Sequence, residues 1–109
     1  MQLTAFPFSI TDFETIPAEI HKGITGFAEW RVLTRDNIRI RELRYSPGYL
    51  ADHWCSKGHI IFCAEGEMTT ELKDGSKHVL KKGMIYTVGD NSDAHRSQSE
   101  NGCTLFVVD

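Results

Sequence analysis

Side chains that can bind a metal ion gather in one short part of the sequence. His53, Cys55 and His59 fall within seven positions of a segment that glycines bound on both sides. All three have odd numbers, and side chains of one parity point to one face of extended backbone. His95 follows later, where closure of a barrel would bring it to the same interior. Imidazole nitrogen and thiolate sulfur suit zinc, iron, nickel or copper better than magnesium or calcium. We therefore expect a divalent metal on His53, His59 and His95.

The remaining histidines and cysteines have simpler interpretations. A single histidine in a β domain is more often a surface or hydrogen-bonded residue than a ligand, and we interpret His21 and His78 in this way. Free cysteines usually behave as small apolar residues, so Cys63 and Cys103 are expected in the core. Cys55 stays a candidate ligand because it lies among the histidines.

Composition limits the classes of function. The chain has 109 residues, which suits one domain, and its 12 basic and 15 acidic residues give a net charge of −3. We expect no nucleic-acid partner, because no basic stripe could neutralise a run of phosphates. No apolar run approaches the roughly 20 residues that cross a bilayer, and no secretion signal is visible. The three cysteines are therefore expected to be free thiols in a cytoplasmic protein.

The elements that must position these residues are short strands. From Gly23 onward, runs rich in β-branched and aromatic residues alternate with turn residues, which is typical of an all-β sandwich or barrel. We expect residues 1–22 to form an arm that packs on the barrel or on a partner, and residues 23–109 to form the barrel. Strands are expected at residues 24–33, 37–41, 60–64, 68–72, 79–80, 84–88 and 104–108.

Three local patterns predict details of these strands. Residues 37–41 alternate isoleucine with arginine, which predicts a half-buried strand with its isoleucines on one face and its arginines on the other. After Glu42 the apolar parity changes, which predicts a bulge or bend. The segment 65–67 is expected to be a turn, and Asp74-Gly75 is a strong hairpin signal.

The spacing of glycines and histidines resembles the two motifs of the cupin superfamily, a group of small jelly-roll barrels. The first motif is a glycine, five residues, His-x-His, three or four residues, a glutamate, six residues and a glycine. The second is a glycine, then Pro-x-Gly, then a histidine. The corresponding positions here are Gly48, His53, Cys55, His59 and Gly66 in the first motif, and Gly83, Gly89, Asn91 and His95 in the second.

This chain departs from the cupin pattern at the positions that matter most. Cys55 stands in place of the second histidine, and His59 stands in place of the glutamate. The resemblance implies a single-domain cupin barrel with metal ligands at His53, Cys55, His59 and His95. The segment 52–59 also looks like the small cupins named for an Asp-His-Cys-Trp motif, although here Trp54 precedes Cys55.

The resemblance implies a pocket but leaves the function open. In the cupin register Cys63, Thr70 and Tyr86 share the inward parity and would line a pocket for a small organic molecule. With Cys55 outside the coordination sphere, an open position would let zinc, iron or nickel support an oxygenase-type or isomerase-type reaction. With Cys55 bound, a closed site would suit a binding or sensing module without turnover. Cupins are often dimers, so a homodimer is expected.

Overall fold

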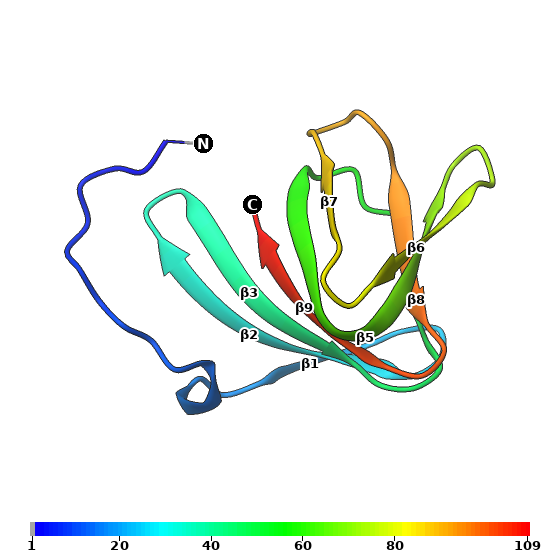
Figure 1. Cartoon of the computed structure of the whole chain (residues 1–109), viewed down its shortest axis with the longest axis horizontal. Coiled ribbons are helices and arrows are strands. Elements are labelled where there is room, and N and C mark those ends of the chain that lie inside the picture. Colours follow the sequence, from blue (N-terminus) through cyan, green and yellow to red (C-terminus); the bar gives the residue numbers. More distant parts are fainter. Residues whose placement is uncertain (1) are drawn as a thin grey trace.

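The computed structural model describes residues 2–109, which fold almost entirely into β-strands (Figure 1). Within this range, one 3-10 helix precedes nine strands. The elements are η1 (Phe13–Thr15), β1 (Glu19–Lys22), β2 (Phe27–Arg35), β3 (Ile38–Tyr45), β4 (Tyr49–Leu50), β5 (His59–Leu72), β6 (Lys77–Lys81), β7 (Ile85–Val88), β8 (His95–Ser99) and β9 (Cys103–Val108).

The long strand β5 joins two antiparallel sheets. Its first part pairs with β7 and β9, and its second part pairs with β6 and β8. The large sheet has the order β1-β2-β3-β9-β5-β7, and the small sheet has the order β4-β8-β5-β6. Figure 1 shows β5 curving so that the two sheets face each other around an interior. The barrel interior therefore lies between sheets that share one strand.

The bend in β5 replaces the turn expected at residues 65–67. The pairing of β5 with β9 shifts register between Cys63 and Glu65, which marks a bulge. Gly66 follows with φ +71°, and a Cβ there would lie 2.4 Å from the carbonyl oxygen of Gly102. The predicted turn is thus wrong, because a bulge and a glycine let the strand bend while it stays paired. The predicted Asp74-Gly75 hairpin is confirmed between β5 and β6.

The bulge or bend predicted after Glu42 is also wrong. The strand pairs with β2 without a register shift from Tyr45 to Ile38, so no bulge follows Glu42. The apolar parity changes because Arg39 and Arg41 lie on the same face as Leu43, and all three line the barrel interior. Arg41 is stable in the interior because the carboxylate of Asp109 and the ring of Trp30 are its partners.

The N-terminal segment lies along one side of the large sheet (Figure 1). Thr4 donates a hydrogen bond to Asp36 and Arg35 donates one to Ser9, while Phe8 and Ile10 are 91% and 86% exposed. The edge strand β1 falls inside the predicted arm and pairs with β2. A homodimer in which a partner covers these apolar side chains stays a prediction. The described chain contains no helix long and apolar enough to cross a membrane.

The core that holds the barrel together lies where β9 packs against β5 and β3. Its buried members are Leu43, Ile61, Cys63, Met68, Leu80, Cys103, Leu105 and Val107. The expected C-terminal strand is confirmed as an inner strand, since β9 pairs with both β3 and β5.

Shortening Leu105 should destabilise the fold measurably. Leu105 is 0% exposed, so Leu105→Ala should lower the free energy of unfolding by about 2 to 5 kcal/mol through lost burial and a cavity. Val79→Ala, at a site that is 49% exposed, should change it by less than about 1 kcal/mol. Urea denaturation followed by circular dichroism measures both. Equal losses in the two variants would contradict this description of the core.

Candidate metal centre

Cys55, His59 and His95 form a compact group of metal-binding side chains inside the barrel. Each offers one donor atom, and the three atoms all lie within 4.8 Å of one another. Both histidines are buried, at 8% and 4% exposure, and their rings meet edge to face with centroids 5.2 Å apart. One thiol and two imidazoles in this arrangement suit zinc or a first-row transition metal.

Backbone pairing places these three residues side by side. His59 is the first residue of β5 and His95 is the first residue of β8. Cys55 lies in the loop before β5, and its N–H donates to the carbonyl of His95 over 2.8 Å. The N–H of His95 donates in return to the carbonyl of Cys55 over 2.9 Å. This isolated bridge fixes the thiol beside the imidazole.

Asp109 orients the imidazole of His59. The Nδ1–H of His59 donates to Oδ2 of Asp109 over 2.7 Å, because an ionised carboxylate can only accept. Arg41 also donates to Oδ2 over 2.9 Å, and Arg39 donates to Oδ1 over 2.9 Å. Burial opposes ionisation of Asp109, but the two arginines and His59 together lower its pKa to about 2. The carboxylate therefore holds His59 with Nε2 directed toward the cluster, where it lies 3.3 Å from Sγ of Cys55.

The two imidazoles have the tautomer that metal binding requires. Burial lowers the pKa of His59, which favours its neutral form. The Nδ1–H of His95 donates to the backbone carbonyl of Asp93 over 2.8 Å. Its buried Nε2 has no hydrogen-bond partner among residues 2–109. A lone pair that is buried and unpartnered beside a thiol and a second imidazole fits a bound metal ion, and hydrogen bonds to the outer nitrogens are usual for metal-bound histidines.

His53, the fourth predicted ligand, lies apart from this group. Its side chain is 67% exposed, and its Nδ1 lies 2.7 Å from Oδ1 of Asp52. It nevertheless lines the same interior cavity as Cys55 and His59. The structure thus brings three of the four predicted ligands together and leaves His53 at the rim. His78 is exposed on β6, where its Nε2 lies 3.0 Å from the hydroxyl of Ser76.

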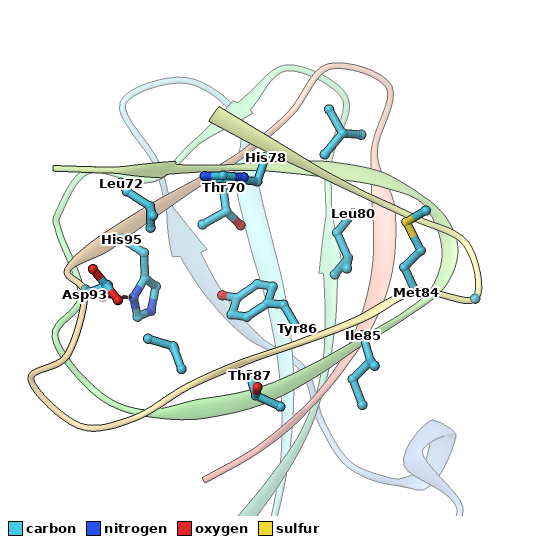
Figure 2. Close-up of a pocket in the computed structure, with 13 residues that line it drawn as sticks. Thr70, Leu72, His78, Leu80, Met84, Ile85, Tyr86, Thr87, Asp93 and His95 are labelled. Carbon is cyan, nitrogen blue, oxygen red and sulfur yellow. Dashed lines mark hydrogen bonds between the residues drawn. The ribbon is translucent and has the colours of Figure 1, made fainter. Parts of the chain in front are cut away.

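Two hollows meet at this centre. The inner cavity, of about 220 Å³, lies between the sheets and reaches the three donors. The edge cleft, of about 600 Å³, lies between β6 and β7 and also reaches His95 (Figure 2). Tyr86 lines both hollows and Thr70 lines the edge cleft. Cys63, the third residue expected in the pocket, lies in the hydrophobic core and lines neither of them.

Several residues of the site carry no clear signal in the sequence. Arg41 and Arg39 alternate with isoleucines, so the sequence pattern predicts that they face solvent. Only the pairing of the strand in the barrel shows that they face the interior. The guanidinium carbon of Arg41 lies 4.5 Å from the centroid of the Trp30 ring, which covers it. Asp109 reaches His59 across 50 residues of sequence, and only the pairing of β9 between β3 and β5 shows this.

Known proteins resemble this chain in structure. A scan against protein-family models finds no match, and a search of curated proteins also finds none. A predicted oxalate decarboxylase from Thermotoga maritima matches with a TM-score of 0.77 at 15% identity, over 92% of this chain and 96% of that one. Ectoine synthase from P. lautus matches with a TM-score of 0.74 at 18% identity, over 93% and 76% of the two chains. A sugar phosphate isomerase of the cupin superfamily from Silicibacter pomeroyi matches with a TM-score of 0.72 at 14% identity, over 92% and 74%.

These likenesses establish the fold. The two facing sheets, the bent shared strand and the solved structures together show that the described chain has the jelly-roll barrel fold of the cupins. The expected fold class is confirmed.

Removing the charge of Asp109 should weaken metal binding without removing a donor atom. Asp109→Asn should lower zinc affinity by about 10- to 100-fold, because outer hydrogen-bond partners of metal-bound histidines typically contribute that much. Asp93→Asn is the matched control, since Asp93 holds His95 through its backbone carbonyl. Competition with a chromogenic chelator measures both affinities. Equal affinities in Asp109→Asn and wild type would show that Asp109 does not orient a ligand.

The three thiols should differ in reactivity. Burial raises the pKa of Cys103 to about 11 and also raises that of Cys63, so neither should react with iodoacetamide in the folded protein. Cys55 is only partly buried, and it should be alkylated in metal-free protein and protected by zinc. Mass spectrometry of peptides locates the label. Protection at Cys55 that is independent of zinc would count against its role as a ligand.

Proposed function

We propose that this protein is a metal-dependent enzyme that acts on a small organic molecule at Cys55, His59 and His95. The observation that carries the proposal is the buried Nε2 of His95, which has no partner in the described part of the chain and lies beside the other two donors. Three protein donors leave a coordination position open, as in catalytic zinc sites. A zinc, iron or nickel ion there would supply Lewis acidity toward a chelating substrate.

The surrounding residues support chemistry rather than structure alone. Asp109 keeps His59 in one tautomer, and the carbonyl of Asp93 does the same for His95. The inner cavity reaches all three donors and the edge cleft reaches His95, so a ligand has room beside the cluster. Enzyme names among the structural neighbours, including an isomerase and a synthase, are consistent with the proposal. An isomerase-type or oxygenase-type reaction is the class we favour.

A second candidate function rests on the position of His53. This residue lines the inner cavity together with the three donors, and a closed site requires its side chain to turn toward them. Four donors would close a tetrahedron around zinc, and the protein would then be a binding or sensing module without turnover.

Elemental analysis of His53→Ala distinguishes the two candidates. In the enzyme proposal, this variant should keep about one metal ion per chain, whereas His95→Ala should lose most of its metal. In the closed-site alternative, His53→Ala should lose zinc affinity to a degree similar to His95→Ala. His78→Ala is the control, because His78 lines the edge cleft on β6 but is not one of the three clustered donors. A wild-type protein that binds no metal under any loading condition would end both proposals.

A further inference from the structure

The two hollows differ in chemistry and share the residues at their junction. Tyr86 and His95 line both the inner cavity and the edge cleft. Arg39, Arg41, Arg96 and Lys57 line the inner cavity. Asp109 pairs with Arg39 and Arg41, and Glu71 pairs with Arg96, so basic side chains outnumber carboxylates around the cavity. The edge cleft, in contrast, is walled mainly by aliphatic side chains such as Leu80 and Met84. A molecule that spans the junction would meet positive charge at one end and apolar surface at the other.

The buried polar atoms near the junction are mostly hydrogen-bond donors. Within residues 2–109, no partner is found for Nε of Arg41 or Nε of Arg96. The hydroxyls of Thr70 and Tyr86 lie close to each other. Arginine can only donate, and a hydroxyl retains a proton to donate. Arg41 is 4% exposed, so its unpartnered N–H lies away from solvent. Leaving such groups unpaired costs free energy, and an occupant rich in acceptor atoms would relieve this cost.

The edge cleft has a polar end and an apolar end. Figure 2 shows Tyr86 crossing its middle, with His95 and Asp93 at one end and Leu80 and Met84 at the other. Val79 and Met84 are 49% and 48% exposed, so apolar surface remains available between β6 and β7. Pockets that bind small molecules commonly combine a mostly apolar wall with a few convergent polar groups.

We infer that the site binds a small monocarboxylate with an apolar tail, its carboxylate near Arg41 and His95 and its tail in the edge cleft. This inference rests on the proposed function for the contact between the carboxylate and the metal. The carboxylate accepts hydrogen bonds from the unpartnered donors and places an oxygen beside the three metal-binding side chains. The tail covers the apolar walls on β6 and β7.

A series of straight-chain acids tests the tail. Isothermal titration of zinc-loaded protein with butanoate, hexanoate and octanoate should show affinity rising about 3- to 4-fold per methylene group. Octanol and octanamide should bind at least tenfold more weakly than octanoate, because neither carries the charge that Arg41 pairs with. Affinity that is independent of chain length, or equal for octanoate and octanol, would overturn the inference.

Two variants localise the two ends of the ligand. Met84→Gln should weaken octanoate binding by roughly 3- to 10-fold and leave butanoate unchanged, since it places a polar group of similar size in the cleft. Ile60→Gln is the matched control, at an apolar site on β5 that is 37% exposed and outside the cleft. Arg41→Lys should weaken binding of all the acids more than binding of octanol, and zinc content is measured on the same sample because Arg41 also holds Asp109. A loss of octanoate binding in Ile60→Gln as large as in Met84→Gln would contradict the assignment of the tail.

Metal content measured on the same samples separates this inference from the proposed function. One zinc per chain together with no acid binding overturns the inference and leaves the metal proposal intact. Absence of zinc refutes the metal proposal, and the acid series on that protein still decides the ligand class. If metal-free protein binds the acids with an affinity that rises with chain length, the site for carboxylate and tail is supported without the metal contact. If the affinity of metal-free protein does not rise with chain length, the inference is overturned.

Discussion

The hydrogen bond from His59 to Asp109 depends on two arginines that keep the carboxylate of Asp109 ionised, and these charged groups make the barrel interior partly polar. A buried carboxylate is stable only when charged or polar groups surround it, and Arg39 and Arg41 provide these partners. Trp30 in turn covers Arg41. The inner faces of β2 and β3 are thus used to stabilise one carboxylate. That carboxylate fixes one imidazole, and a small barrel therefore has an interior that is partly polar.

The division of the barrel into two regions follows from this arrangement. One region is the closed apolar core of Leu105 and its neighbours, which supplies stability. The other is the inner cavity, which the arginines, the histidines and Tyr86 surround. A barrel of this size usually fills its interior with side chains, so a cavity lined by charged groups marks the part of the interior that packing does not require.

The sequence predicts those features that depend on local pattern. The all-β class, the Asp74-Gly75 hairpin and the inner position of β9 follow from composition and turn residues, and the fold agrees with them. The proximity of Cys55, His59 and His95 also agrees with parity and with barrel closure. The orientation of the arginines and the contribution of Asp109 depend on pairing between distant strands. Alternation in β3 predicts a bulge only if its polar residues face solvent, and the strand is regular because Arg39 and Arg41 face the interior.

The isolated bridge between Cys55 and His95 has a consequence for the order in which the protein assembles. Its two backbone hydrogen bonds join residues 40 positions apart, and the contact of His59 with Asp109 spans 50 positions. Neither contact is available to a partly folded chain in which β8 and β9 are undocked. Long-range pairing of this kind forms slowly, so the three donors come together only when the same strands that complete the core have docked. The arrangement of the donors therefore depends on completion of the barrel rather than on local sequence.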